Sequence, residues 1–412
     1  MTTTATPVTS PGTVPTAAQV REFVEAHLPD EWRRTLDAGD AAALERLRLD
    51  PEHGRAWYEV LGRAGLATPT WPAEYHGLGL TPADAAGIRA ALADLGVGRP
   101  AADEVGIDMG GPTVLEWGTD EQKARWLPPL ARGAQRWCQL FSEPGAGSDL
   151  ASLATRAVPQ PDGGWLVTGQ KVWNSYAHIA DLGMLLARTD PGRPKHHGIS
   201  FFVVDMHAPG VEVRPLRQIT GDSEFNEVFL TDVRLPPDAL LGPLHAGWRV
   251  AISTLMSERS SISGRPSIGP GRATRLVRRA LATGAWQDPL LRDRLVQLFV
   301  EERALQTTTI RASVELAHQL PGAEGSVRKL RNAELDETAG LLAADIDPDA
   351  VTAWDPSGPR PSAVDDFLQM KKISIAGGTS EIQRTIIGER MLGLPKDPDP
   401  DRDLPFDART VR

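Results

Sequence analysis

The sequence predicts an α+β protein of several domains: an N-terminal α-helical domain, a middle antiparallel β domain and a C-terminal helical bundle. The chain has 412 residues, more than the size at which one hydrophobic core stops growing. Apolar residues recur at helical spacing in the first and last thirds, whereas the middle third contains short runs rich in Val, Phe, Leu and Trp. We therefore expect a disordered tail followed by the three domains, over residues 1–18, 19–135, 136–242 and 243–412.

The N-terminal helices are predicted from the spacing of their apolar residues and from one capping box. VREFVEAHLPDEW, AALERLRL and AAGIRAALADLG place apolar residues three or four positions apart. Thr119 followed by Gln122 predicts a helix start in GTDEQKARWL, because each side chain can accept a hydrogen bond from the other residue's backbone N–H. The opening residues are rich in Thr and Pro and have little to bury, so we expect them to be frayed.

The middle domain is predicted from short apolar runs punctuated by Gly, Pro and Asp, a pattern typical of antiparallel strands. These runs are RWCQLFS, GWLVTGQKVW, LGMLLART, GISFFVVDM, VEVRPL and NEVFLTDVRL. Long amphipathic stretches return after Gly247 and indicate the bundle. They include GWRVAISTLMSERSSI, LLRDRLVQLFVEERALQTTTIRASVELAHQL and SEIQRTIIGERMLG.

The composition excludes several classes of function. A formal net charge of -10 argues against a nucleic-acid partner, which selects clustered Lys and Arg. No apolar run approaches the roughly 18 residues of a membrane span, and the chain start lacks a basic and apolar leader. Cys138 is the one cysteine, and the adjacent His196 and His197 lack the spaced partners of a metal site. We expect a cytoplasmic protein without a disulfide, a metal, nucleic acid or membrane insertion.

Three motifs could hold a ligand, and each also has an ordinary structural explanation. In SEPGAGSD, over residues 142–149, the glycines would let backbone N–H groups approach an anion or a ring edge, although a hairpin turn fits as well. Trp173, next to Asn174 and Ser175, could pack in the core or back a planar cofactor. GGTSEIQR, over residues 377–384, is a capped helix start whose free N–H groups could also receive a cofactor or a thioester oxygen.

Taken together, the blocks of this sequence resemble those of the acyl-CoA dehydrogenases. The blocks are WPAEYHGLGL, GTDEQKARWLPPL, SEPGAGSD, GQKVWNS, ITGDSEFNEVFLTDVRLP and GGTSEIQRTIIGERMLGLP, and they occur in the family's order and at its spacing. The resemblance implies a C-terminal four-helix bundle and FAD as the cofactor. It also implies which residues surround the flavin and the acyl thioester: Gln139, Leu140, Phe141, Ser142, Ser148, Trp173 and Ser175, with Thr379 and Glu381 against the cofactor.

A desaturating flavoenzyme of this kind needs a carboxylate that removes the α-proton of the thioester within a dry pocket. Many members of the family carry it immediately before the Gly-Thr of the last motif, where this chain has Gly377. Other members carry a glutamate just before an arginine on the first bundle helix, which matches Glu258 and Arg259. Helical spacing also puts Glu258 on an apolar stripe with Leu255 and Ile262, where desolvation would strengthen it as a base. An ordinary solvated glutamate is the alternative.

The resemblance implies an α,β-desaturation. Glu258 would remove the α-proton while flavin N5 accepts the β-hydride, and the backbone N–H of Gly377 would donate to the developing enolate oxygen together with a flavin ribityl hydroxyl. Ser148, Arg259 and Gly378 would contact the substrate, an acyl-CoA or an acyl-carrier-protein thioester. An electron-transferring flavoprotein would accept the electrons.

Two segments depart from the family pattern. Homo-oligomers of the family use an Arg-x-x-Phe-Gly stretch and a later Gly-rich segment to hold the ADP portion of a neighbour's FAD, whereas this chain has RALATGAW over residues 279–286 and PGAEGS over residues 321–326. We therefore expect either a homo-oligomer that holds this portion by other residues or one subunit of a heteromer with a related chain. Retention of Glu258, SEPGAGSD and Trp173 favours a catalytic chain. A flavin oxidase or monooxygenase on the same fold is a third hypothesis, which the Glu-Arg pair and the Gly-Gly-Thr motif disfavour.

Overall fold

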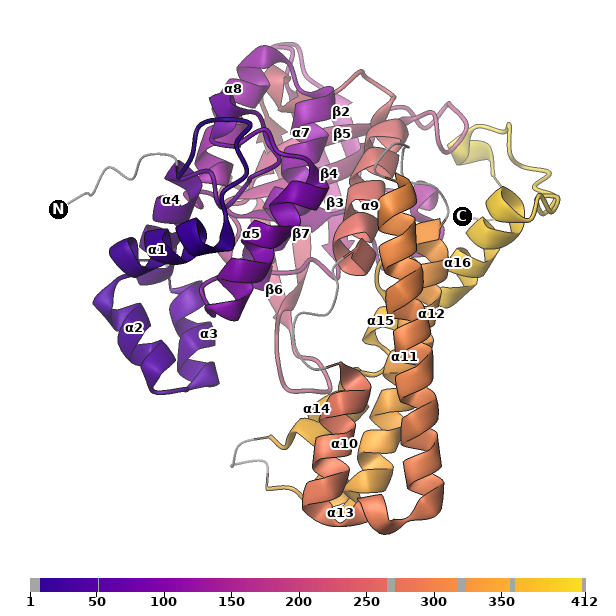
Figure 1. Cartoon of the computed structure of the whole chain (residues 1–412). Helices are drawn as coiled ribbons and strands as arrows, with labels where there is room; N and C mark the ends of the chain where they lie inside the picture. Colours follow the sequence, from indigo (N-terminus) through magenta and orange to yellow (C-terminus); the bar gives the residue numbers. More distant parts are fainter. Residues whose placement is uncertain (1–7, 51, 265–270, 317–323, 356–359, 410–412) are drawn as a thin grey trace. The chain divides into compact units, whose positions relative to one another are not determined.

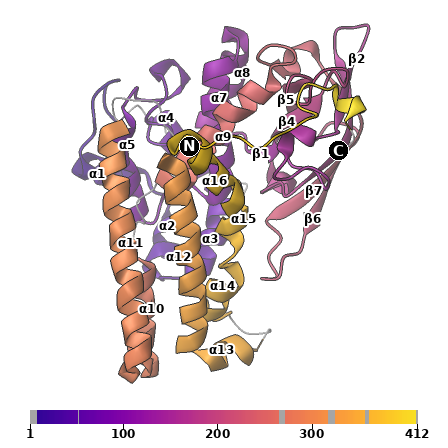
Figure 2. The same ribbon diagram turned by 90° about the vertical axis from the view of Figure 1, so that its right-hand side faces the viewer.

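The computed structural model describes residues 8–50, 52–264, 271–316, 324–355 and 360–409. The chain forms two compact units (Figures 1 and 2). The first comprises Met1–Leu216, Ser223–Thr254 and Pro400–Arg412, and the second comprises Arg217–Asp222 and Leu255–Asp399. Each unit has a hydrophobic core of its own.

Helices form the N-terminal part of the first unit, as predicted. They are α1 (Ala17–His27), α2 (Asp30–Asp37), α3 (Ala41–Leu49), α4 (His53–Arg63), α5 (Pro82–Asp94), α6 (Ala101–Glu104), α7 (Gly111–Trp117) and α8 (Asp120–Ala131). Large aromatic side chains fill the core between them. Trp32 lies 6.1 Å from Trp57 between ring centroids and packs edge-on against Tyr58 at 6.2 Å.

Two capping boxes set helix starts in this part. The predicted box of Thr119 and Gln122 begins α8. Thr16 and Gln19 form a second box at the start of α1. The same Thr-x-x-Gln spacing that predicts the first box is present at the second, inside the segment expected to be frayed.

The disordered tail expected over residues 1–18 is therefore wrong for its second half. Helix α1 already begins at Ala17. Before it, the backbone N–H of Val8 donates to the carbonyl of Ala64 at 3.3 Å, and that of Gly12 donates to Leu78 at 2.7 Å. These bonds hold the segment against the helical core, and residues 1–7 lie outside the described part of the chain.

The middle of the chain folds into one sheet, which confirms the predicted β domain. Its strands are β1 (Trp137–Leu140), β2 (Arg156–Pro159), β3 (Trp165–Val172), β4 (Leu182–Arg188), β5 (Ile199–Asp205), β6 (Val211–Leu216), β7 (Phe225–Leu235) and β8 (Leu240–Leu241). The order is β6-β7-β3-β2-β4-β5-β8, with β1 paired to β4. Most pairs are antiparallel, but β1 and β2 both run parallel to β4. The short strands β2 and β8 carry too few apolar residues for the pattern to predict them.

The short length of β2 positions the candidate site. β2 begins at Arg156, which lies opposite Thr168, so the last residues of β3 extend beyond it. The loop after β1 occupies this place beside β3, because the N–H of Val172 donates to the carbonyl of Ser142 at 3.0 Å. The two sequence motifs SEPGAGSD and WNS therefore begin next to each other.

Helices make up nearly all of the second unit, which confirms the predicted bundle. They are α10 (Arg272–Thr283), α11 (Pro289–Leu316), α12 (Glu324–Ile346), α13 (Pro348–Thr352), α14 (Ser362–Gln369), α15 (Lys372–Ile375) and α16 (Ser380–Ile386). Figures 1 and 2 show α10, α11 and α12 side by side. Leu276, Leu298 and Leu342 are buried in the core that these helices share.

The bounds expected for the C-terminal domain, residues 243–412, differ from the observed units. The first half of α9 (Gly247–Gly264) belongs to the first unit, where the hydroxyls of Thr254 and Thr113 are hydrogen-bonded at 2.9 Å. Residues 400–409 also pack on the β domain, where the ring of Phe406 lies against the guanidinium of Arg188.

Candidate active site

The loop over residues 142–149 begins at a buried ion pair. The ammonium of Lys171, which is fully buried, lies 2.8 Å from a carboxylate oxygen of Glu143 and donates to the carbonyl of Phe141 at 2.9 Å. The carboxylate also accepts hydrogen bonds from the backbone N–H groups of Ala154 and Thr155, at 2.7 and 2.9 Å. One side chain of the loop thus joins β3 to the segment that leads into β2.

Both members of this pair have shifted pKa values. Burial lowers the pKa of Lys171 to about 8, against the opposing effect of the Glu143 carboxylate. Burial alone would raise the pKa of Glu143, but the charge and hydrogen bond of Lys171 and the N–H donors outweigh it, so this pKa lies below its ordinary value. Both groups are therefore charged at neutral pH.

The middle of the loop is open. A Cβ added at Gly145 or Gly147 would meet no atom within 4 Å, so packing within the protein does not require glycine at either position. Ser148 is exposed. At the far end, Asp149 accepts two 2.8 Å hydrogen bonds from Lys195. The loop is therefore anchored at both ends, while its glycines leave the backbone between the anchors accessible to a ligand.

Trp173 is exposed, and its backbone is conformationally strained. A tryptophan that packs in the core would show neither feature. Its φ is +62°, a left-handed conformation that is costly for a bulky residue, and 61% of the residue is exposed. The ring meets Phe225 edge-on at 6.0 Å between centroids. The alternative that Trp173 packs in the core is wrong.

A buried amide pair holds this strained backbone. Asn174 and Asn226 exchange hydrogen bonds: the backbone N–H of Asn174 donates to the carbonyl of Asn226 at 3.0 Å, and the Asn226 amide donates to the Asn174 carbonyl at 2.8 Å. The side-chain amide of Asn174 also donates to the carbonyl of Gln139 at 2.7 Å, which links the end of β3 to β1. Ser175, half-buried, follows in the same segment.

The residues predicted from β1 contribute in different ways. Leu140 and Phe141 point into the core, and Phe141 packs edge-on against Phe201, so only their backbone could contact a cofactor. Gln139 differs, because its side-chain Nε2 is buried without a hydrogen-bond partner. The Oδ1 atom of the neighbouring Asn174 is likewise unpartnered. Buried polar atoms of this kind are costly unless a ligand or water satisfies them.

In the second unit, the glycine pair at residues 377 and 378 forms the turn between α15 and α16. Both adopt left-handed φ values, +64° and +86°, which favour glycine. The Gln383 amide donates to both glycine carbonyls at 3.1 Å, and the buried ammonium of Lys329 donates to the carbonyl of Gly378 at 2.6 Å. A glutamate at position 377 would be strained in this conformation.

The two predicted cofactor contacts of α16 lie at its start. The hydroxyl of Thr379 caps the helix by accepting from the N–H of Ile382 at 3.3 Å. Glu381 is largely exposed, and its own backbone N–H and the Thr379 hydroxyl hold its pKa below the ordinary value. Within this unit, therefore, Glu381 faces solvent rather than a pocket.

Glu258 and Arg259 lie in α9, as the helical spacing predicts. Ala251 and Thr254 are fully buried, and position 258 follows both of them at helical spacing. The side chains at 258 and 259 lie outside the described part of the structure, so the role of Glu258 as a base stays a prediction.

Sequence reasoning missed the buried polar side chains that hold these segments. They are Lys171, Asn226, Lys329 and Gln383. A signal was available for Lys171, which stands at even spacing from the inward-facing Val167 in GWLVTGQKVW and therefore requires a carboxylate partner. The other three occur in segments whose pattern gives no comparable signal.

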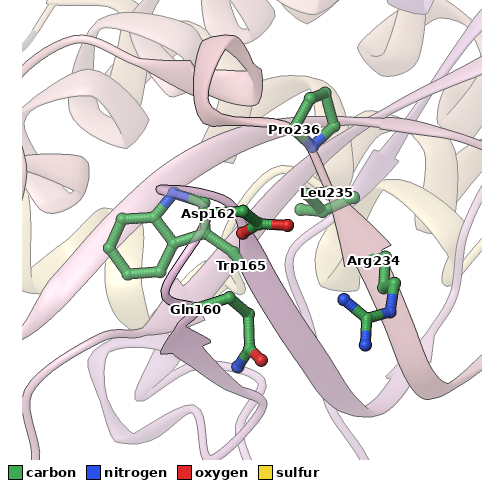
Figure 3. A pocket seen from close by; sticks show the side chains of 6 residues that line it. All are labelled: Gln160, Asp162, Trp165, Arg234, Leu235 and Pro236. Carbon is green, nitrogen blue, oxygen red and sulfur yellow. The ribbon is translucent and has the colours of Figure 1, made fainter.

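A small surface hollow lies elsewhere in the β domain (Figure 3). It is lined by Gln160, Asp162, Trp165, Arg234, Leu235 and Pro236. It shares no residue with the predicted site. Among the residues that the structure describes, no group of three or more His, Cys, Asp or Glu side chains could hold a metal ion. None of the described helices is long and apolar enough to cross a bilayer.

Replacing Glu143 with Gln is expected to destabilise the β domain by about 3 kcal/mol, because the buried ammonium of Lys171 then lacks its carboxylate. Urea unfolding at pH 7 measures the loss. Glu212→Gln, which breaks the exposed ion pair with Arg214, is the matched control and should leave the free energy of unfolding nearly unchanged.

The effect of Glu143→Gln should also depend on pH. The pKa of Glu143 is lowered in the folded state, so its stabilising contribution is fully present above the ordinary value of 4.5 and is lost as the pH falls through the folded pKa. The measurements stay below pH 8, where Lys171 remains charged. A difference between wild type and variant that does not shrink below pH 4.5 would contradict this assignment.

The chain matches three family models in succession. They describe the acyl-CoA dehydrogenase N-terminal domain over residues 16–134, the middle domain over residues 138–233 and the C-terminal domain over residues 245–392. Together these matches cover most of the chain and follow the order predicted from the sequence.

Similar proteins and structures agree. The chain is 44% identical to acyl-CoA dehydrogenase FadE34 of Mycobacterium tuberculosis over 86% of its own length, but spans about half, 48%, of that protein. It is 40% identical to acyl-CoA dehydrogenase IpdE1 of Mycobacterium tuberculosis, over 92% of this chain and 97% of that one.

Two solved structures have the same fold. The Tcur3481-Tcur3483 steroid ACAD has a TM-score of 0.74 at 26% identity, over 92% of this chain and 97% of that one. The ChsE4-ChsE5 complex from Mycobacterium tuberculosis has a TM-score of 0.72 at 25% identity, over 93% and 97%. The chain therefore belongs to the acyl-CoA dehydrogenase family of oxidoreductases.

Proposed function

We propose that the chain is an FAD-dependent acyl-CoA dehydrogenase that introduces an α,β double bond into an acyl thioester, with Glu258 as the base. Two observations together carry the proposal: Trp173 is strained and exposed, and the Nε2 of Gln139, whose carbonyl binds the adjacent Asn174, is unpartnered. A planar ligand with a polar edge would cover the indole and accept a hydrogen bond from the amide. Its binding would offset the free-energy cost of the strain and of the unpartnered amide.

The residues present fit a flavin. The open backbone at Gly145 and Gly147 leaves room for a ring edge, and Ser148 and Ser175 add hydroxyl donors. The left-handed Gly377 and Gly378 precede the capped start of α16, where backbone N–H groups favour an oxygen ligand. Thr379 and Glu381 are proposed to contact the same cofactor.

In the proposed reaction, the chain supplies the base and the oxyanion contact. Glu258 removes the α-proton of the thioester, and the backbone N–H of Gly377 donates to the thioester oxygen as negative charge develops there. Arg259, Ser148 and Gly378 orient the substrate. A bound flavin supplies the acceptor for the β-hydride.

Glu258→Gln is the direct test. The variant should retain its flavin, but the rate at which substrate bleaches the flavin should fall about a thousandfold, because an amide cannot accept the α-proton. Stopped-flow absorbance under anaerobic conditions measures the rate. Glu301→Gln, an exposed carboxylate of α11, is the control and should behave as wild type. Near-normal bleaching by the Glu258 variant would eliminate this residue as the base.

Trp173→Gly separates the effect of the strained tryptophan on stability from its effect on flavin binding. Glycine adopts the φ of +62° without penalty, so the thermal stability of the flavin-free variant should equal or exceed that of wild type. Its flavin content should fall, because the indole face is gone. A variant that keeps full flavin occupancy would show that Trp173 does not support the cofactor.

The substrate and the electron acceptor are further parts of the proposal. We propose a CoA or carrier-protein thioester as the substrate and an electron-transferring flavoprotein as the acceptor. The similar structure named a steroid ACAD makes ring-containing acyl thioesters the first compounds to test.

A second form of the proposal is a heteromer with a related chain. Helix α11 carries a row of exposed apolar side chains, Val296, Phe299, Val300 and Ile310. Such a row along one helix indicates a partner surface. Two of the similar structures are named as pairs of chains, Tcur3481 with Tcur3483 and ChsE4 with ChsE5. Both observations support assembly with another chain.

Val300→Glu tests whether α11 is this partner surface. Placing a charge in the row should reduce the mass of the particle in solution, measured by light scattering alone and after co-expression with a related chain. Val158→Glu, on β2, also alters an exposed valine and is the control. An unchanged mass for both variants would place the interface elsewhere.

A further inference from the structure

The end of the chain crosses the β domain as a short strap, defined here as residues 400–409. The N–H of Phe406 donates to the carbonyl of Arg193 at 2.9 Å, and that of Asp407 donates to Pro191 at 3.3 Å. Pro405 forms an isolated bridge with Pro194. These bonds fix the strap to the connection between β4 and β5.

The strap brings the ring of Phe406 onto the guanidinium of Arg188, 3.5 Å from the ring centroid. Arg188 ends β4 and is only 4% exposed. Its three nitrogens donate to the backbone carbonyls of Leu153, Lys195 and Ala151, at 3.1, 3.1 and 2.7 Å. Burial lowers the pKa of Arg188 to about 10, partly offset by the charge of Glu143. The guanidinium is thus a buried cation whose direct partners are neutral carbonyls.

Two of these three carbonyls belong to the segment that follows the SEPGAGSD loop. Ala151 and Leu153 directly follow the loop. Lys195, held through its carbonyl, uses its ammonium to bind Asp149 at the end of the loop. Water that reached the guanidinium would compete for the same donors, and the aromatic face both excludes water and attracts the cation.

We propose that Phe406 and Arg188 are positioning residues, through which the C-terminal strap sets the geometry of the loop over residues 142–149. Removing the ring admits water to the guanidinium, loosens its hold on Ala151 and Leu153, and frees the loop to move. The consequence for catalysis rests on the proposed function, which assigns this loop to the flavin and the thioester. The effect of the strap on the geometry of the loop is independent of the proposed function.

Hydrogen–deuterium exchange of the purified chain tests the structural part. In Phe406→Ala, peptides covering residues 142–155 should exchange about five- to tenfold faster than in wild type, with unchanged exchange in the helical N-terminal part. Phe406→Tyr retains the aromatic face and should restore the slow rate. Leu404→Ala removes an exposed side chain from the same strap and is the matched control.

Equal exchange of this loop in Phe406→Ala and wild type would overturn the proposal. An equal acceleration by Leu404→Ala would also overturn it, because the effect would then belong to the strap in general. If Phe406→Ala does not fold, Phe406→Leu serves in its place and should accelerate exchange relative to Phe406→Tyr.

Steady-state kinetics with an acyl-CoA thioester test the catalytic part. Phe406→Ala should raise KM more than it lowers kcat, because the loop must be reordered when substrate binds. A wild-type chain without activity on thioesters would count against the proposed function and leave the exchange result valid. Normal kinetics together with unchanged exchange in an active enzyme would count against the positioning role alone.

Discussion

A buried ammonium in the middle of the β domain has to be neutralised, and the loop after β1 supplies the carboxylate that does so. The ammonium of Lys171 lies 2.8 Å from the Glu143 carboxylate, which in turn accepts hydrogen bonds from the backbone N–H groups of Ala154 and Thr155. Removing one partner leaves a charge in a site that water cannot reach, which costs several kcal/mol. The path of the loop is therefore fixed by the need to satisfy this charge, and the glycines between its two anchors stay accessible.

Two of the segments that the sequence singles out, one in each unit, have left-handed backbone conformations held by buried polar groups. In the β domain, Trp173 adopts a left-handed conformation beside the Asn174 and Asn226 pair. In the bundle, the Gly377–Gly378 turn is held by Gln383 and Lys329. Strain of the kind seen at Trp173 is typical of sites that are built for a ligand rather than for stability, whereas the two glycines adopt their conformation without strain.

The sequence predicted the order of the helical, β and helical parts, because apolar periodicity reports directly on which face of an element is buried. It also located the SEPGAGSD, WNS and GGTS segments. It did not predict that β1 and β2 run parallel to β4, which depends on pairing between distant strands. The helix start at Thr16 was not predicted, because the Thr- and Pro-rich composition of the opening residues indicates a frayed segment, whereas the Thr16–Gln19 capping box stabilises a helix there. The return of the strap to Arg188 is a contact between residues more than 200 positions apart, and no local pattern encodes it.

The proposed function requires that flavin chemistry operates in this chain. The most direct measurement is the visible absorption spectrum of the purified protein, alone or with a co-expressed related chain, before and after anaerobic addition of a panel of acyl-CoA thioesters. We expect flavin bands that bleach with at least one thioester. A protein that contains no flavin in either preparation, or flavin that every thioester leaves oxidised, would contradict the proposed function.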